Sequence, residues 1–334
     1  MSISRKDFLK LAGGSAAAFA FTGTFLQGCK KVLTEMGERK PVIWLQAQSC
    51  SGCSVSILNS LDPGIAAVIT KHISLNFHQT LMGGTGHVAV SVLEEAVKKK
   101  RKDFVLIVEG SIPTKAEEYC TIGEVNGKHV GAKEWVEELG SNAAAIMTFG
   151  TCSAFGGIPA AEIRATGDNP TGAKPVSAIL PKAKIINIPG CPPHPDWMIG
   201  TIVHVLRWGI PELDELNRPK MFFGKTVHEQ CEHLPDYKRG IFAKKWGDRG
   251  CLYQLGCLGM DTGCDIPKRK WIGTNSCTGS GSGCIGCTEP VFPDTGKRGI
   301  YKHLTASLEE INKIEDKQIV KAVLNLRNGG VING

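Results

Sequence analysis

Signatures of several common enzyme and binding classes are missing from this sequence. It has no phosphate-binding loop, no Ser-His-Asp order of a hydrolase and no zincin motif. After residue 28 no run approaches the roughly 20 apolar residues that span a membrane. Aromatic residues are only 7% of the chain, and none interrupts the basic runs at residues 98–102 and 268–270. We therefore predict no hydrolase and no nucleic-acid partner, and we expect both runs to be solvated surface, with docking patches as the alternative.

The composition is otherwise that of a soluble globular protein, except in two residue types. Hydrophobic residues make up 42% and charged residues 21% of the 334 positions, and the chain is long enough for two domains. The exceptions are 40 glycines and 13 cysteines. The cysteines form groups and crowd toward the C-terminus, so they are not scattered core residues.

The first 28 residues have the pattern of a bacterial export leader. Residues 4–10 carry charged side chains, and residues 11–28 are uncharged and rich in Ala, Gly and Phe. The leader resembles a twin-arginine signal in which Lys6 stands in place of the second arginine. It ends in Leu26-Gln27-Gly28-Cys29, which resembles a lipobox. We predict a leader over residues 1–28 and an acylated, membrane-anchoring Cys29, with a plain cleaved signal or an uncleaved anchor as alternatives.

The chain after the leader is predicted to be an α/β domain followed by an irregular one. Short apolar runs alternate with helical periodicity over residues 41–210, which predicts a flavodoxin-like, doubly wound parallel sheet. We expect strands at residues 42–46, 73–77, 104–109, 143–149 and 184–188, and helices at residues 55–61, 87–100, 132–139 and 196–208. Residues 220–300 hold seven cysteines and show little periodicity, so bound metal would supply folding free energy there. A helical tail is expected over residues 301–334.

Four cysteines follow strands of the predicted sheet. Cys50 and Cys53 come after the first strand, Cys152 after the fourth and Cys191 after the fifth. Ligand sites in such sheets form at the carboxyl ends of the strands, where residues distant in sequence can meet. We therefore expect a four-thiolate site at this edge. Glu109 ends the third strand near it, and we expect a structural role there, with a proton path as the alternative.

Residues 220–300 supply two further candidate ligand sets. One is His228, Cys231, Cys251 and Cys257, and the other is Cys264, Cys277, Cys284 and Cys287. Zinc sites and disulfides remain open alternatives in an exported protein. Tight CxxC pairs in glycine-rich loops, and three sets of four ligands, favour iron-sulfur clusters for electron transport. Of the other cysteines, Cys29 is the lipidation candidate and Cys120 is expected to be a buried thiol.

Five segments together resemble one protein family. They are residues 42–53, which include Cys50-Ser51-Gly52-Cys53, and residues 108–113, 150–152, 189–193 and 283–290. In combination they resemble the small subunits of periplasmic nickel-iron hydrogenases, with most likeness to the selenium-containing branch. The resemblance extends from the leader to about residue 293.

The resemblance implies an electron-transfer subunit with three four-iron clusters. It implies a proximal cluster on Cys50, Cys53, Cys152 and Cys191, a medial cluster on Cys264, Cys277, Cys284 and Cys287, and a distal cluster on His228, Cys231, Cys251 and Cys257. It also implies a large subunit holding the nickel-iron site, where H2 is oxidised reversibly to protons and electrons. No catalytic residue is then expected on this chain, and electrons would pass to an external carrier such as a cytochrome c. The expected location is the periplasm, at the membrane through Cys29.

Four positions bear on the type of each cluster and its properties. Many family members have a proline where this chain has Cys277, and their medial cluster has three irons. A fourth ligand predicts a four-iron cluster here, with three irons as the alternative. Oxygen-tolerant members carry extra cysteines at the positions of Gly52 and Gly157, so we expect an ordinary proximal cluster and no oxygen tolerance from that source. A neutral His228 in place of a thiolate should raise the distal potential.

Two other kinds of protein compete with this interpretation. A quinone-linked respiratory subunit has a related proximal-cluster domain but generally carries one cluster, so the two C-terminal sets argue against it. A zinc-stapled or disulfide-stapled envelope binding module is the other alternative, and it would be colourless.

Overall fold

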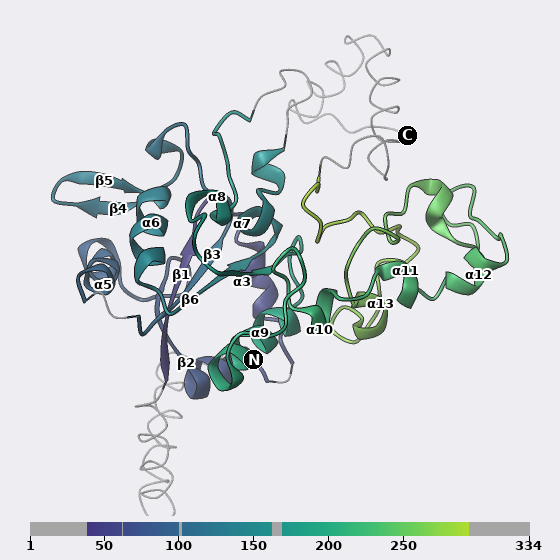
Figure 1. Cartoon of the computed structure of the whole chain (residues 1–334), viewed down its shortest axis with the longest axis horizontal. Helices are drawn as coiled ribbons and strands as arrows, with labels where there is room; N and C mark the ends of the chain where they lie inside the picture. The colour runs from purple at the N-terminus through teal and green to yellow at the C-terminus, as the bar shows by residue number, and fades with distance from the viewer. Residues whose placement is uncertain (1–38, 62, 100–101, 162–168, 294–334) are drawn as a thin grey trace, which may run out of the picture.

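The computed structural model describes residues 39–61, 63–99, 102–161 and 169–293 (Figure 1). The leader with Cys29 and the tail expected over residues 301–334 lie outside the described residues. Across the described ranges, no helix combines the length and the apolar character that crossing a membrane requires.

A five-stranded parallel sheet forms the centre of the first half (Figure 1). Its strand order is β2-β1-β3-β6-β7, which is the flavodoxin-like order once two hairpin strands are set aside. The predicted fold class is therefore confirmed. The strands are β1 Lys40–Gln46, β2 Ile73–His78, β3 Val105–Glu109, β6 Ala145–Phe149 and β7 Ile185–Ile188.

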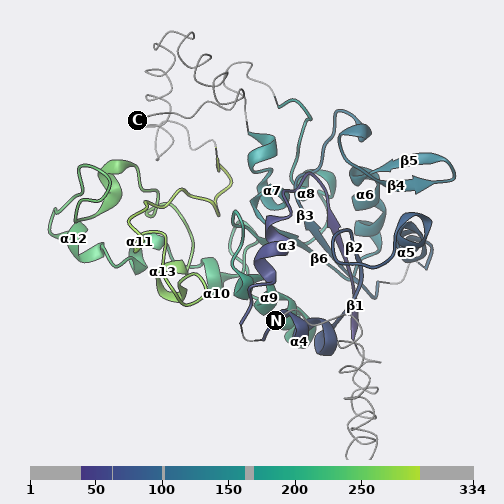
Figure 2. The ribbon, with the colours of Figure 1, turned by 180° about the vertical axis from the view of Figure 1, so that it is seen from behind.

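Helices cover both faces of the sheet (Figure 1, Figure 2), which explains why its strands read as apolar runs. In β1, Val42 and Trp44 face one apolar cluster, whereas Ile43 and Leu45 face the other. The first face packs against α3 Gly52–Ile57 and α9 Pro195–Trp208, and the second against α5 Gly86–Lys99, α6 Ala132–Asn142 and α8 Val176–Ile179. Shorter elements are α4 Ile65–Ala67, a π-helix at Val68–His72, α7 Thr151–Phe155, and 3-10 turns at Glu117–Tyr119 and Ile158–Ala160.

The expected strands all form, but one hairpin was not foreseen. The first helix begins at Gly52 rather than at residue 55, because Ser51 is left-handed (φ 61°) and the helix follows it directly. The unforeseen hairpin pairs β4 Thr121–Val125 with β5 Lys128–Gly131. Its turn residues Asn126 and Gly127 both have positive φ, a sequence signal typical of tight hairpins.

Residues 220–293 consist of short helical turns joined by irregular chain, as expected. Their own apolar cluster has three buried members, Ala243, Leu252 and Leu255. Phe222 and Ile266 pack instead into the cluster on the sheet. Because the two halves share that core, a domain division near residues 210–220 stays a prediction. The turns are α10 Lys220–Phe223, α11 Val227–Gln230, α12 Leu234–Lys238, α13 Ile266–Arg269 and a 3-10 turn at Leu252–Leu255.

A buried arginine joins the two halves. The guanidinium of Arg218 pairs with Asp214 at 2.7 Å and with Glu289 at 2.8 Å, and the arginine side chain is 8% exposed. It also donates to the carbonyl oxygen of Thr288 at 3.0 Å. Since Glu289 lies two residues beyond Cys287, this arginine holds the last cysteine-bearing segment against the sheet half.

The second basic run is not simply solvated surface, so that prediction is wrong for Arg269. Its guanidinium pairs with Asp265 at 2.6 Å and Asp196 at 2.9 Å, and lies 5.1 Å from the ring centroid of Phe222. The run of basic residues does not indicate in the sequence that Arg269 pairs with Asp196, 73 residues away. Lys98 in the first run is exposed, as predicted.

Candidate metal centres

The first cysteine set lies at the carboxyl edge of the sheet. Cys50 precedes α3 and Cys53 lies within it, Cys152 lies in α7 after β6, and Cys191 follows β7. Burial raises the pKa of the Cys53 thiol well above its usual value, and the charges of Glu109 and of the other three thiols raise it further. All four thiols therefore lie within electrostatic reach of one another.

Two glycines let the backbone approach these thiols. Gly150 has φ of 94°, and a Cβ placed there would lie 2.5 Å from Cys53 Sγ. Gly157 has φ of 54°, and its Cβ would lie 2.8 Å from Cys152 Sγ. In this structure, a side chain at either position would force the cysteine sulfur or its neighbours to shift.

We expect the variant Gly150→Ala to lose the irons held at the first set, about four per chain. The added methyl would displace Cys53 Sγ, whereas a metal site tolerates errors of only about 0.5 Å. Gly127→Ala is the matched control, since Gly127 also has positive φ (79°) but has no atom within 4 Å of its Cβ position. Iron and sulfide analysis of both variants measures the effect. Equal iron content in the two would show that the close approach does not matter.

Glu109 is a fully buried carboxylate that organises this edge. It accepts hydrogen bonds from the indole N–H of Trp44 (3.1 Å), the hydroxyl of Ser49 (2.9 Å) and the backbone N–H of Cys53 (3.1 Å). Ser54 also donates to it. These donors compensate a buried charge, so the geometry supports the structural role expected for Glu109.

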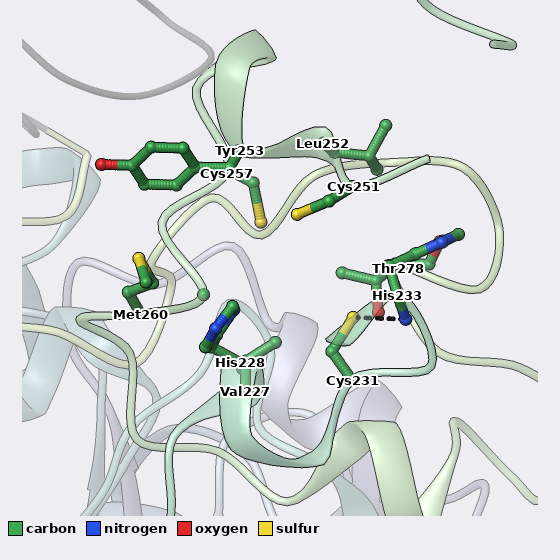
Figure 3. Close-up of a pocket in the computed structure, with 11 residues that line it drawn as sticks. Val227, His228, Cys231, His233, Cys251, Leu252, Tyr253, Cys257, Met260 and Thr278 are labelled. Carbon is green, nitrogen blue, oxygen red and sulfur yellow. Dashed lines mark hydrogen bonds between the residues drawn. The ribbon is translucent and has the colours of Figure 1, made fainter. Parts of the chain in front are cut away.

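The second set surrounds a small cavity (Figure 3). His228, Cys231, Cys251 and Cys257 all line it, and the three sulfur atoms point into the space between them. Burial raises the pKa of the Cys231 and Cys251 thiols. Four donors around one cavity fit a bound metal cluster.

Two histidines line this cavity, and their surroundings distinguish them. In His233, Nε2 lies 3.2 Å from the carbonyl oxygen of Thr278, and Nδ1 lies 3.8 Å from Asp236. Both ring nitrogens of His233 thus have protein partners, and its backbone N–H donates to Cys231 Sγ at 3.4 Å. His228 instead packs its ring on the edge of Tyr237, with centroids 4.5 Å apart. His228 is therefore the better candidate for a ligand.

The third set lines a second, larger cavity. Cys264, Cys277, Cys284 and Cys287 all contribute to its wall, together with Cys191 of the first set. Burial raises the pKa of the Cys284 and Cys287 thiols to about 12. Iron must therefore displace a proton from each of these two thiols when it binds.

The third set adjoins each of the other two. Cys191 of the first set lines the same cavity as the four cysteines of the third. The N–H of Cys284 in the third set donates to Cys257 Sγ in the second, at 3.2 Å. The spatial order is therefore first, third, second, although the third set comes last in the sequence.

Two threonines that the sequence did not single out also touch the thiols. Thr278 is hydrogen-bonded to Cys231 and Thr262 to Cys284, and each bond opposes the effect of burial on the thiol pKa. Thr278 directly follows Cys277 of the third set, yet it touches a cysteine of the second. Sequence neighbourhood therefore does not reveal these contacts.

The ligand side chains of each set line a space and do not converge on a single point. Within the described ranges, no three His, Cys, Asp or Glu side chains gather closely enough to hold one metal ion. The twelve cysteines of those ranges are free thiols. Cys120 is only half-buried, so the expectation of a buried thiol is met in part; burial raises its pKa.

Two family models match the chain in consecutive stretches. Residues 50–205 match the NADH ubiquinone oxidoreductase 20 Kd subunit, and residues 223–298 match the C-terminal part of the NiFe/NiFeSe hydrogenase small subunit. The second match covers the segment that carries the second and third cysteine sets.

Relatives of known name cover nearly the whole chain. The periplasmic [NiFeSe] hydrogenase small subunit of Desulfomicrobium baculatum is 42% identical over 319 residues, covering 90% of this chain and 99% of that relative. The quinone-reactive Ni/Fe-hydrogenase small chain of Wolinella succinogenes is 40% identical, covering 88% and 82%. The solved structure of a reduced, active Ni-Fe-Se hydrogenase from Desulfomicrobium baculatum has a TM-score of 0.72 at 44% identity, covering 77% of this chain and 96% of that one.

A flavodoxin-like domain that continues into cysteine-lined cavities is typical of an iron-sulfur redox protein. The chain belongs to the small subunits of nickel-iron hydrogenases, as its motifs predicted. These are the electron-transfer subunits of oxidoreductases that act on H2, and this part of the predicted function is confirmed. Relatives named periplasmic in Desulfomicrobium baculatum and Solidesulfovibrio fructosivorans support a periplasmic location.

Proposed function

We propose that this chain relays electrons through three four-iron clusters between a nickel-iron site on a large subunit and an external carrier. The observation that carries the proposal is that the third set adjoins both others: Cys191 lines its cavity, and the N–H of Cys284 donates to Cys257 Sγ at 3.2 Å. This adjacency supports a third set between the other two. A relay needs such a contiguous order, whereas separate structural staples do not.

The ligand assignments follow the three sets. We assign Cys50, Cys53, Cys152 and Cys191 to a proximal cluster, Cys264, Cys277, Cys284 and Cys287 to a medial cluster, and His228, Cys231, Cys251 and Cys257 to a distal cluster. Thiolate donors suit iron-sulfur clusters. Donors that surround a space favour a cluster over a single zinc ion, whose ligands all lie about 2.0–2.3 Å from one point.

The residues of this chain bury cysteine ligands and orient their sulfur atoms. Iron-sulfur clusters supply one-electron transfer when bound. Cys53, Cys264 and Cys284 are buried, which shields these three ligands of the first and third sets from water. The N–H groups of Cys284 and Gly286 donate to the sulfurs of Cys257 (3.2 Å) and Cys284 (3.5 Å), and such bonds tune cluster potentials.

The partners and location are proposed on the same basis. A large hydrogenase subunit is the first partner, and a cytochrome c is the proposed external carrier. Export by a twin-arginine-like leader and anchoring through acylated Cys29 complete the proposal. The name of the first relative supports the selenium-containing branch.

We also propose an ordinary proximal cluster that confers no special oxygen tolerance. A Cβ at Gly52 would lie 3.1 Å from Cys50 Sγ, and one at Gly157 would lie 2.8 Å from Cys152 Sγ. Both positions adjoin the proximal set but supply no sulfur. Hydrogen oxidation is measured in air, and its persistence there would count against this proposal.

The respiratory alternative has partial support. The match of residues 50–205 to a ubiquinone oxidoreductase subunit fits its proximal-cluster domain. The hydrogenase match over residues 223–298 covers the medial and distal sets that such a subunit would lack. The hydrogenase function is therefore favoured.

Metal analysis of the anaerobically purified complex tests the proposal. We expect about twelve irons per small subunit and no signal of an oxidised three-iron cluster in electron paramagnetic resonance. About eleven irons with that signal would remove Cys277 as a ligand and leave the relay intact. Zinc, or no metal, would overturn the relay.

The variant His228→Cys tests the distal assignment. We expect it to keep its irons but to lower the distal midpoint potential by on the order of 100 mV, because a thiolate is negative where imidazole is neutral. A redox titration followed by electron paramagnetic resonance measures the shift. His233→Gln is the control, and it should leave the iron content unchanged. A shift in the control alone would make His233 the ligand.

A further inference from the structure

The surface over the distal set is built by the chain between two of its cysteines. We call residues 238–249 the basic loop; it follows α12 at the far end of the molecule from β5 (Figure 1). The N–H of Cys251 donates to the carbonyl of Ile241 at 2.9 Å, and the N–H of Ala243 donates to the carbonyl of Cys251 at 3.0 Å. The basic loop is thus hydrogen-bonded directly to a distal ligand.

The outward charges of the basic loop are positive. Its only carboxylate, Asp248, is turned back on the loop, where it accepts the backbone N–H groups of Lys244 at 3.3 Å and Lys245 at 3.2 Å. Five basic residues of the loop are exposed: Lys238, Arg239, Lys244, Lys245 and Arg249.

Three neighbouring carboxylates offset part of these charges, and each also has a contact within its own chain. The Asp236 side chain is 15% exposed and faces His233. Glu232 accepts hydrogen bonds from Ser276 at 2.7 Å and Thr278 at 3.2 Å, so its carboxylate is engaged by its own chain. Glu229 caps α11 by accepting from Thr226. Over residues 229–249 the five basic side chains outnumber the four carboxylates by one, and the positive charges are concentrated on the basic loop.

Aromatic rings lead from the distal set to the same surface. The ring of Tyr237 lies against His228, and its centroid is 5.9 Å from that of Tyr253, which is 46% exposed. Trp246 in the basic loop is 48% exposed and Ile241 is 39% exposed. An exposed aromatic centre with a charged rim is the usual anatomy of a protein-protein interface.

We infer that the basic loop and these rings form the docking surface for the electron partner, and that this partner is a redox protein with acidic residues around its exposed cofactor. The inference rests on the proposed distal cluster. Opposite charge steers such a partner to the site and raises the association rate, an effect that salt screens. An anionic lipid surface would satisfy the charges but would make no use of the aromatic route from His228, so a redox protein is favoured.

The test uses the iron-loaded heterodimer and two electron acceptors that share one haem. They are mitochondrial cytochrome c, which is basic, and the same protein with its lysines succinylated, which is acidic. We expect H2-driven reduction of the acidic form to be about tenfold faster at low ionic strength, and the advantage to vanish in high salt. In the variant Lys244→Glu/Lys245→Glu the preference should be lost or reversed.

The control variant Lys128→Glu/Lys182→Glu makes the same change in net charge at exposed sites of the sheet half. It should keep the preference for the acidic cytochrome. Equal loss in both variants, or no change in an iron-loaded Lys244→Glu/Lys245→Glu complex, would overturn the docking surface and leave the relay standing. Binding to phosphatidylglycerol vesicles that only this variant abolishes, with cytochrome rates unchanged, would overturn it in favour of a membrane contact. A wild-type complex without iron would overturn the proposed relay itself.

Discussion

Replacing Cys284 and Cys287 together with alanine is expected to remove the medial cluster and to unfold much of residues 227–287, while the sheet stays folded. The separate apolar cluster of this half has only three buried members, so cluster binding must supply much of its folding free energy. The effect should reach several kcal/mol, in line with other metal-stapled domains. Hydrogen exchange of the anaerobic complex measures it. Amides of residues 227–287 should lose protection, and those of β3 and β6 should keep it.

Cys120→Ala is the matched control for this variant. Cys120 belongs to none of the three sets and packs half-buried against the other face of the sheet. Its replacement should leave the iron content and the protection of residues 227–287 unchanged. If the double variant lost iron but kept that protection, apolar packing rather than metal would be what stabilises this half.

Replacing Arg218 with methionine is expected to destabilise the protein by about 3–5 kcal/mol. The change would leave Asp214 and Glu289 buried without their counter-charge, although their side chains are only 17% and 14% exposed. It would also free the segment after Cys287 from the sheet half. Urea unfolding followed by the iron-sulfur absorbance should show a lower midpoint.

An exposed ion pair of the same length provides the comparison. Lys220 and Glu212 also lie 2.7 Å apart, but their side chains are 48% and 78% exposed. Water and salt screen such a pair, so Lys220→Met should barely move the urea midpoint. Adding Asp214→Asn and Glu289→Gln to Arg218→Met should restore part of the loss. No recovery would mean that the packing of Arg218, not its charge, is what stabilises the junction.

The sequence predicts the sheet half well because local physics determines it. Strands buried on both faces must be continuous apolar runs, and residues 42–46 and 105–109 are recognisable as such from their composition. The rule that ligands gather at the carboxyl ends of parallel strands then predicts that Cys50, Cys152 and Cys191 meet at one edge. The hairpin at Asn126-Gly127 also has a local sequence signal. The pattern of alternating apolar runs and helices does not reveal it.

The metal half resists prediction because its contacts are distant and follow no period. Nothing local to Cys284 indicates that its N–H meets Cys257, 27 residues earlier. His228 and His233 flank Cys231 at similar spacing, and only their contacts in the folded chain, such as those of His233 with Thr278 and Asp236, separate their roles. Arg269 stands in a run of basic residues, and only the folded chain brings it to Asp196.

The interleaved order of the three sets has a consequence for biosynthesis. The chain emerges from the ribosome with the proximal ligands first, the distal ligands next and the medial ligands last, as far as Cys287. A polypeptide truncated before that point would hold the two ends of the proposed relay with nothing between them. The proposed medial cluster therefore cannot be completed until translation has passed residue 287, whereas the ligands of the other two sets are all present earlier.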